Sequence, residues 1–238
     1  MGLDKGISDS GINRWSFNSE VATVFDSHVR KSVPYYDIFH NTIANISDWF
    51  LSDGSKVLDI GTSSGELIKN LAKRHTNKVI NYIGVDTSKY MCEVAMKNLS
   101  HLNNVIIHNK NALEVVSDIN ECSMITSILT LQFIPYKDRL GLIKNIYSAL
   151  HKGGAFIVVE KVLSEDSNID KMFLDLYHDY KFDQGLNESE IFHKARAIRG
   201  VMSPTTYNDN LDMLYKCGFN KVDVFFKWCN FVGYIAIK

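Results

Sequence analysis

The segment Val57-Leu58-Asp59-Ile60-Gly61-Thr62-Ser63-Ser64-Gly65 decides the fold, because it joins a buried strand to a glycine-bearing turn. The apolar run at 56–60 is typical of a strand in a parallel sheet, and a helix is expected directly after the turn. Glycine lacks a Cβ, so the backbone at Gly61 and Gly65 can approach a ligand closely. Asp86 ends the next expected strand, where a carboxylate can accept two hydrogen bonds from a ribose diol. Together these residues predict a site for an adenosine-containing ligand.

The spacing of the two glycines narrows the choice of ligand. Gly61 and Gly65 are four residues apart, no third glycine completes the dinucleotide pattern G-x-G-x-x-G, and the chain has no phosphate-loop G-K-[ST]. The form D-I-G-x-x-x-G resembles motif I of the Rossmann-like S-adenosylmethionine (SAM) dependent methyltransferases. The turn alone fits any doubly wound sheet equally well, and Asp86 shifts the interpretation toward SAM.

Length and composition favour one domain. The chain has 238 residues with 45% hydrophobic content, which is enough for one sizeable core. We therefore expect a single SAM-binding domain over residues 1–238, with a helical cap at 1–52. The 26 basic and 27 acidic residues leave a net charge of −1, which argues against a nucleic-acid partner and for a small-molecule substrate or SAM alone.

The cysteine, histidine and hydropathy patterns argue against a disulfide-rich, metal-binding, membrane or secreted protein. The four cysteines lack C-x-x-C spacing and the histidines lack metal-ligand spacing, so we expect neither a disulfide framework nor a metal. No apolar run reaches the roughly 20 residues of a membrane helix, and the start of the chain has no signal-peptide core. We expect a cytoplasmic protein without a membrane partner.

Alternating apolar and amphipathic stretches predict an α/β, Rossmann-like class I SAM methyltransferase fold. Its sheet has seven mostly parallel strands and a C-terminal antiparallel hairpin. Strands are expected at 56–60, 80–85, 104–108, 123–129, 154–160, 223–228 and 231–237. Helices are expected at 65–74, 88–99, 136–150, 166–182 and 207–216. Residues 18–50 form an N-terminal cap of two helices, broken at Ser32-Val33-Pro34 by proline.

Motifs outside the turn resemble one family along nearly the whole chain, the carboxy-S-adenosylmethionine synthases of tRNA wobble-uridine modification. The matching segments are Trp15-x-Phe17, Val21-Ala22-x-Val24-Phe25, Lys31-Ser32-Val33-Pro34-x-Tyr36, Thr130-Leu131-Gln132-Phe133, Gly153-Gly154-Ala155, Glu160-Lys161, His178-Asp179-Tyr180-Lys181 and Asn230-Phe231. The resemblance implies an enzyme that binds SAM, decarboxylates and dehydrates prephenate, and captures the carboxylate on the sulfonium methyl. It also implies a homodimer, with an insertion at 183–204 over the substrate side.

The family's cofactor contacts carry over to Tyr36, Gly61, Ser63, Asp86 and Thr87. Including the rest of the turn and the adenine side, we expect the cofactor-binding residues Tyr36, Asp59, Gly61, Thr62, Ser63, Gly65, Asp86, Thr87, Asn111, Ala112 and Phe133. The chain departs from the family at two of its cofactor-side positions. Asn111-Ala112 replaces an Asp-Ile pair, and Ile128 replaces an asparagine.

The largest departure lies in the segment 188–196, which aligns with the family's E-x-E-I-x-x-K-R. The arginine that clamps the transferred carboxylate falls on Ala195, and a guanidinium suits that role because it offers paired donors and keeps its charge. Arg196 or Arg199 can replace it only by reaching in from another position on the helix, since one residue is a rotation of about 100°. We expect loss of the clamp rather than compensation.

Four functions remain open on this basis. The favoured hypothesis is methyl transfer from SAM to a small acceptor, which requires alignment with the sulfonium in a dry pocket. The second is a reaction of SAM alone, in which its amine attacks its own γ-carbon to give azetidine-2-carboxylate and methylthioadenosine. The third is carboxy-SAM synthesis with a displaced arginine. The fourth is a non-catalytic SAM-binding subunit.

Candidate catalytic residues are Tyr36, Tyr177 and His178. Aromatic faces attract a sulfonium cation, whereas the bulk of Phe133 and Tyr180 favours a core position by about two to one. Tyr35 is a further aromatic of the cap. His178 has the ordinary pKa of a general base, but it can equally form a structural hydrogen-bonded pair with Asp179, and Glu160-Lys161 can form an internal ion pair.

Overall fold

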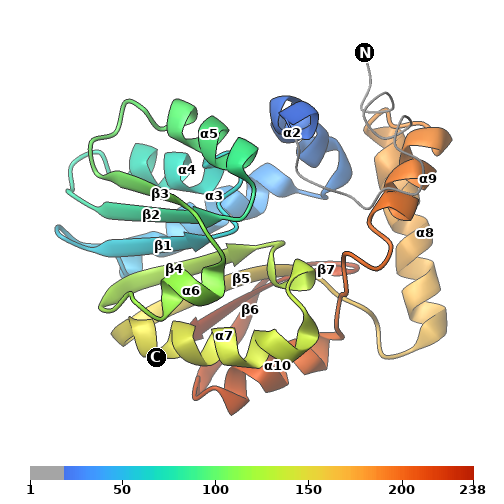
Figure 1. The fold of residues 1–238 in the computed structure, drawn as a ribbon. Coiled ribbons are helices and arrows are strands. Elements are labelled where there is room, and N and C mark those ends of the chain that lie inside the picture. The colour runs from blue at the N-terminus through green and yellow to red at the C-terminus, as the bar shows by residue number, and fades with distance from the viewer. Residues whose placement is uncertain (1–18) are drawn as a thin grey trace.

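The computed structural model describes residues 19–238 and has one seven-stranded sheet with helices on both faces (Figure 1). The strands are β1 (Lys56–Ile60), β2 (Asn81–Asp86), β3 (Val105–Asn109), β4 (Cys122–Ile128), β5 (Leu150–Lys161), β6 (Lys221–Trp228) and β7 (Phe231–Ile237). Their order is β3-β2-β1-β4-β5-β7-β6. β1 to β5 pair in parallel, whereas β7 pairs antiparallel with both β5 and β6. The predicted fold class is confirmed, including the terminal hairpin.

Helices pack two separate cores against the faces of the sheet. They are α2 (Ser19–Ser32), α3 (Tyr36–Ile46), α4 (Glu66–Arg74), α5 (Lys89–Asn98), α6 (Ala112–Val116), α7 (Tyr136–Ala149), α8 (Ser167–Asp183), α9 (Glu188–Ala197) and α10 (Tyr207–Lys216), with 3₁₀ turns η1 (Ser47–Trp49) and η2 (Leu131–Phe133). Successive strand residues point to opposite faces. In β1, Leu58 and Ile60 join the core under α6, α7 and α10, while Val57 joins the core under α3 and α4.

The cap breaks where the sequence predicts. α2 ends at Ser32 and α3 begins at Tyr36, because proline at position 34 disfavours a helix at and before itself. Tyr35 between them takes the left-handed conformation at φ 57°. The family segment Trp15-x-Phe17 lies outside the described residues.

Some boundaries differ from the prediction. β5 begins at Leu150 rather than at 154, because Gly153 and Gly154 continue the strand instead of ending the preceding turn. The backbone N–H of Gly153 donates to the carbonyl of Lys238, and Lys238 N–H donates back to Gly154. α6 was not predicted; Asn111 starts it by accepting a hydrogen bond from the N–H of Leu113 at 3.0 Å.

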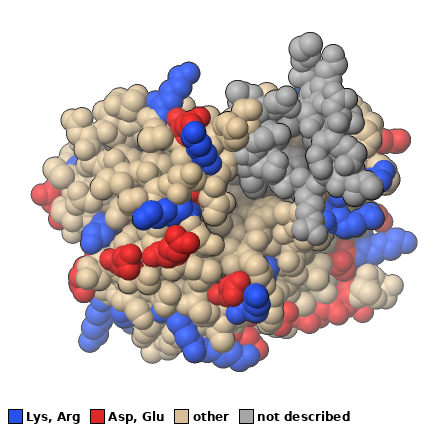
Figure 2. Space-filling view, viewed as in Figure 1, with Lys and Arg blue, Asp and Glu red and all other residues tan. Residues whose placement is uncertain are grey.

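The sheet order places the ends of β1, β2 and β4 at one edge. Because β1 pairs with β2 on one side and β4 on the other, the strand order reverses beside β1, which is where open α/β sheets bind ligands. The face in Figure 2 shows Lys and Arg interspersed with Asp and Glu, in keeping with the net charge of −1. No helix of the described part is long and apolar enough to cross a membrane.

Candidate cofactor and substrate cavity

The turn after β1 has a fixed backbone that requires glycine at its first position. Gly61 has φ 71°, and a Cβ added there would lie 2.1 Å from Thr130 Oγ1, so a side chain is excluded by both conformation and space. The N–H groups of Gly61 and Thr62 donate to the carbonyl of Val85 at 2.8 and 3.0 Å. The turn is therefore bound to the end of β2.

Asp86 closes this turn from the other side. One carboxylate oxygen accepts the N–H of Ser63 at 3.0 Å and the other accepts the N–H of Ser88 at 2.8 Å. Burial raises the pKa of Asp86, and these backbone N–H groups counteract the shift. A carboxylate oxygen can accept more than one hydrogen bond, so Asp86 retains acceptor capacity for a ligand while it holds the turn.

A cavity of about 470 Å³ opens beside the turn. The predicted cofactor and catalytic residues on its wall are Tyr36, Asp59, Gly61, Thr62, Ser63, Asp86, Thr87, Asn111, Ala112, Phe133, Tyr177 and His178. Gly65 does not belong to this wall. It precedes α4 at φ 80°, and a Cβ there would lie 2.7 Å from Leu99 Cδ1, so its glycine serves close packing.

Two wall residues have their polar groups engaged within the protein. Asp59 is buried and accepts a hydrogen bond from Thr126 Oγ1 at 2.6 Å; burial raises its pKa to about 6. The side chain of Asn111 caps α6. Ile128, in place of the family's asparagine, presents an apolar side chain to the cavity.

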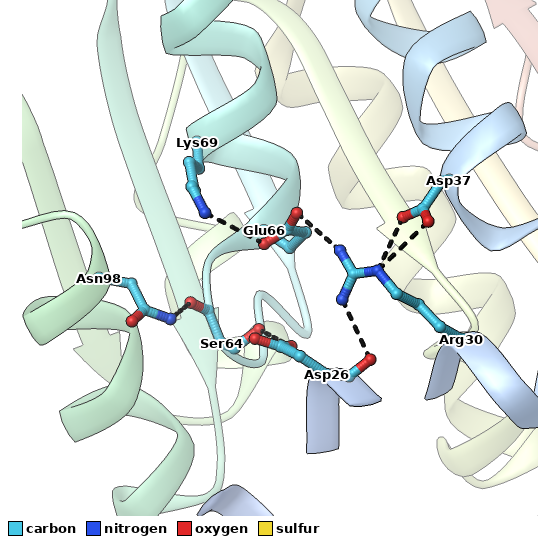
Figure 3. A network of polar contacts seen from close by, with 7 residues as sticks. All are labelled: Asp26, Arg30, Asp37, Ser64, Glu66, Lys69 and Asn98. Carbon is cyan, nitrogen blue, oxygen red and sulfur yellow. Dashed lines mark hydrogen bonds and ion pairs between the residues drawn. The ribbon is translucent and has the colours of Figure 1, made fainter. Parts of the chain in front are cut away.

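A polar network ties the cap helix α2 to the turn (Figure 3). Asp26 accepts a hydrogen bond from Ser64 Oγ at 2.5 Å, and the Arg30 guanidinium binds Glu66 and Asp37, each at 2.9 Å. Figure 3 shows Arg30 reaching between α3 and the start of α4. The network holds α2 so that its apolar side chains, such as Phe25 and Val29, line the cavity.

Three lysines on the cavity wall are linked to Tyr177, two through its ring and one through Ser32. Tyr177 is buried, and its hydroxyl donates to the carbonyl of Ser32 at 2.7 Å. The ammonium nitrogens of Lys181 and Lys161 lie 3.7 and 4.7 Å from the centre of the Tyr177 ring, within the range of a cation–π contact. We call Lys161, Lys181 and Lys194 the lysine cluster; all three line the cavity.

Two of the groups that bind Lys194 are neutral. Its ammonium group donates to His28 Nε2 at 2.7 Å and to Ser32 Oγ at 2.9 Å. Burial, followed by the charges of Lys194 and other lysines, lowers the pKa of His28 to about 3, so its imidazole is neutral. Burial and the charge of Lys161 lower the pKa of Lys194 to about 7.

The pKa values of the other two lysines of the cluster are also lowered. Burial, then the charges of Lys194 and Lys161, lower the pKa of Lys181 to about 7. Burial lowers the pKa of Lys161, and the charge of Asp170 partly offsets that shift. The lysine cluster is thus a site of mutual repulsion at the cavity wall.

The arginines considered as replacements for the family clamp lie elsewhere. Ala195 lines the cavity, but Arg196 and Arg199 do not; Arg196 packs over the ring of Phe192 at 5.7 Å. The sequence analysis considered only arginines at this wall and did not single out the three lysines that line it. The available signal was that all three lysines fall in segments that match the family.

The expected ion pair between Glu160 and Lys161 needs correction. Glu160 and Lys161 do not form an ion pair, because adjacent strand residues point to opposite faces. The Glu160 carboxylate accepts the N–H groups of Thr130, Leu131 and Gln132 at 2.9 to 3.1 Å. Burial raises the pKa of Glu160 to about 8 against the effect of these donors.

The predicted aromatic residues divide between cavity and packing. Phe133 and Tyr36 line the cavity, and the Tyr36 ring packs against the ring of His40 with 4.2 Å between centroids and a tilt of 35°. Tyr180 packs with Tyr35 and Trp228 outside the cavity wall, at centroid distances of 6.3 and 5.6 Å.

His178 lines the cavity and stacks beside Tyr177, and no hydrogen bond joins it to Asp179 in the described structure. Burial lowers the pKa of His178. Within residues 19–238 no group of three His, Cys, Asp or Glu side chains is arranged to hold a metal ion.

A family model described as a methyltransferase domain matches residues 57–154. The carboxy-S-adenosyl-L-methionine synthase of Staphylococcus epidermidis is 45% identical over 231 residues, covering 94% of this chain and 97% of the relative. The synthase of the same name from Nautilia profundicola is 36% identical and covers 94% and 95%.

Solved structures share the fold at lower identity. A putative SAM-dependent methyltransferase from Methanococcus maripaludis superposes with a TM-score of 0.62 at 18% identity, covering 95% of both chains. Phosphoethanolamine N-methyltransferase 2 from Haemonchus contortus, solved in complex with SAM, has a TM-score of 0.66 at 14% identity and covers 100% of this chain and 60% of its own.

Proposed function

Because the chain belongs to the family of carboxy-S-adenosyl-L-methionine synthases, we propose that it converts SAM into its carboxymethyl derivative with a carboxylate-bearing second substrate. The chain is a SAM-dependent enzyme of methyltransferase fold. One observation carries the choice of reaction: a single cavity contains both the glycine turn and the lysine cluster. Lysine ammonium groups on the wall of the same cavity suit an anion as the partner of SAM.

The turn end of the cavity fits SAM on two grounds. The close approach of Gly61 to Thr130 leaves backbone rather than a side chain at the turn, and Asp86 keeps acceptor capacity for a ribose diol. Bound SAM supplies the sulfonium whose methyl carbon receives the carboxyl group. Asp86 then orients the nucleoside, and the cap side chains Phe25, Val29 and Tyr36 exclude water from the cavity.

The net reaction defines what the protein must hold. Prephenate loses a carboxyl group and a hydroxide to become phenylpyruvate; the carboxyl replaces one hydrogen of the SAM methyl, and that proton leaves with the hydroxide as water. The second substrate brings two carboxylates into the cavity, next to which the lysine cluster supplies positive charge. No protein nucleophile is required by this balance.

Two of the alternative reactions bring no second anion to the lysine cluster. Cyclisation of SAM to azetidine-2-carboxylate uses no second anion. Methyl transfer to a neutral acceptor needs a base, and His178, which lines the cavity and whose pKa is lowered by burial, is the candidate among the residues predicted to be catalytic. Family membership makes the chain an enzyme, which sets aside the non-catalytic subunit.

Product analysis tests the proposal. The purified protein is incubated with SAM alone and with SAM plus prephenate, and products are identified by mass spectrometry. Carboxylated SAM together with phenylpyruvate is expected only in the second mixture. Methylthioadenosine together with azetidine-2-carboxylate from SAM alone would instead establish cyclisation, and S-adenosylhomocysteine formed only with an added nucleophilic acceptor would establish methyl transfer.

We further propose a cytoplasmic homodimer built from one domain per chain. α8 exposes a row of apolar side chains, Ile169, Met172 and Leu176, at helical spacing of three and four residues. In Figure 1 α8 and α9 stand at one side of the sheet, where such a row is available to a second copy. Light scattering of the unaltered protein and of Met172→Glu tests this: the charge is expected to give a monomer.

A further inference from the structure

We infer that His40, on α3, is a further cofactor-binding residue, whose imidazole N–H donates a hydrogen bond to the carboxylate at the amino-acid end of SAM. His40 lies outside the motifs that match the family, and its residue type gave no reason to single it out in the sequence. The inference rests on the SAM site of the proposed function and is independent of the reaction that SAM undergoes there.

His40 brings two unpaired ring nitrogens to the cavity wall. The residue lines the cavity and is 3% exposed, and neither Nδ1 nor Nε2 has a hydrogen-bond partner within residues 19–238. A buried polar group without a partner costs free energy that a bound ligand can recover. The χ2 angle of histidine is broad, and a half-turn about it exchanges each ring nitrogen with a ring carbon. A nitrogen can therefore be turned toward a ligand without movement of the helix.

Contacts within the cap hold His40 beside the glycine turn. Its ring packs against that of Tyr36, and the guanidinium carbon of Arg30 lies 5.6 Å from the centre of the Tyr36 ring. The Arg30 guanidinium binds Glu66, the first residue of α4 and the one that follows Gly65 (Figure 3). This series of contacts places His40 at the cofactor end of the cavity, where the cap meets the turn.

The order of the strands decides which part of SAM reaches this place. Adenine is expected beside Asn111, after β3, and the ribose at Asp86, at the end of β2. The next strand in the sheet is β1, whose end leads into the turn at Gly61. SAM bound in this way crosses the strand ends from β3 to β1, so its amino-acid end passes the turn and meets the cap at His40.

The electrostatic surroundings of His40 favour the carboxylate of SAM over its ammonium group. Burial, followed by the positive charge of Arg30, lowers the pKa of His40 to about 3. The imidazole is therefore neutral and has one N–H donor. No carboxylate of the described chain accepts a hydrogen bond from it. A neutral donor on which a positive charge acts suits an anionic acceptor.

A matched pair of probes tests the contact without turnover. The probes are S-adenosylhomocysteine and its decarboxylated analogue, in which an aminopropyl group replaces the amino-acid end, so they differ only by the carboxylate. Each is titrated by calorimetry into the unaltered protein and into His40→Phe, which keeps a flat ring to pack against Tyr36 and removes both nitrogens. We expect His40→Phe to weaken S-adenosylhomocysteine about tenfold, the equivalent of one hydrogen bond to a charged group, and to leave the analogue unchanged.

Folding stability separates this role from a structural one. His40→Phe replaces an unpaired polar group by an apolar ring of similar shape, so the free energy of unfolding of the ligand-free variant should be unchanged or higher. Denaturant unfolding measures it. The matched control is His101→Phe, because His101 is exposed and lies outside the cavity wall; it should change neither affinity. An equal loss of affinity for both probes in His40→Phe, together with lower stability, would overturn the inference.

The outcome is separable from that of the proposed function. Unchanged affinity of His40→Phe for S-adenosylhomocysteine refutes the contact with His40 and leaves the proposed reaction standing. A tenfold loss confined to the probe with the carboxylate, without formation of carboxylated SAM from SAM and prephenate by the unaltered protein, keeps the contact and refutes the reaction.

Discussion

The two ends of the cavity are built on different principles. The cofactor end is made by residues 57–88 in one stretch of chain, where backbone N–H groups and the Asp86 carboxylate fix each other. The basic end is made by side chains from β5, α8 and α9, which meet through Ser32 and Tyr177. The first end depends on backbone geometry and the second on charge.

This difference explains why one end tolerates change and the other does not. A side chain at Gly61 would collide with Thr130, and no neighbour can compensate for that. Charge acts over several ångströms and can be supplied from more than one position. Under the proposed function, the ammonium groups of the lysine cluster supply positive charge to a cavity in which this chain has Ala195 in place of the family arginine.

The largest effect of a substitution is expected at Glu160, where the two ends of the cavity are joined. Its carboxylate binds three backbone N–H groups of the Thr130–Gln132 turn, and the next residue is Lys161. Glu160→Ala leaves these buried donors unpaired and should lower the free energy of unfolding by about 3–5 kcal/mol. Denaturant unfolding measures it.

Glu160→Gln keeps the shape of the side chain but leaves one acceptor oxygen in place of two. Its carbonyl oxygen can keep the bonds made by one carboxylate oxygen, so about half of the loss is expected. A loss below about 1 kcal/mol in the alanine variant would mean that the joint between the two ends is held by packing alone.

The second largest effect concerns the cofactor end. Asp86→Ala removes the ribose acceptor and the bonds to Ser63 and Ser88, and should weaken S-adenosylhomocysteine about 100-fold, as expected for loss of a charged acceptor. Calorimetry measures it, with Glu93→Ala, an exposed acid on α5, as control. The comparison fails if phenylpyruvate binding to the cofactor-free protein falls by the same factor.

Sequence reasoning reached the cofactor end because its determinants are local. Gly61 and Asp86 are read from a strand, a turn and the next strand, and the parallel alternation that predicts the sheet also brings their ends together. Gly65 was assigned to the ligand because its contact with Leu99 depends on helix packing that is not visible in the motif. The direction of Glu160 away from Lys161 was predictable from strand alternation alone.

The basic end was beyond the same reasoning for a physical reason. Whether Lys194 or Arg196 enters the cavity depends on how α9 is rotated against the cap, and that rotation is fixed by contacts with His28 and Ser32 on a distant helix. Lys181 similarly depends on the position of Tyr177. Such tertiary contacts have no local pattern in the chain.

The third prediction uses pH to separate the two ends. The pKa of Lys181 and that of Lys194 are lowered to about 7, so both are largely charged at pH 6 and largely neutral at pH 8.5. An anion needs the charged forms, so its affinity should fall as pH rises through 7. Above the pKa, the expected fall is about tenfold per pH unit for each neutral lysine that must take up a proton when the anion binds. Phenylpyruvate binding is titrated from pH 6 to 8.5.

The neighbouring titratable groups do not reverse the expected fall of phenylpyruvate affinity with rising pH. His28, with its pKa of about 3, stays neutral over the range; burial also lowers the pKa of His178, and Asp170 acts on Lys161 by raising its pKa. S-adenosylhomocysteine, bound by backbone and Asp86, should keep its affinity over the same range. Anion affinity that rises with pH, or cofactor affinity that falls in parallel, contradicts the division between the ends.

The smallest effect is expected from restoring the family residue. Ala195 is exposed and lines the cavity, so Ala195→Arg has space for a guanidinium beside Lys194. The gain in phenylpyruvate affinity should be only about two- to fivefold, because a partly solvated ion pair contributes little and a fourth cation adds repulsion. Ala195→Gln, similar in reach but uncharged, should bind as the unaltered protein does. A gain of 100-fold or more would mean that the lysines provide only a background charge and that the basic end, like the cofactor end, depends on one geometric element that this chain has lost.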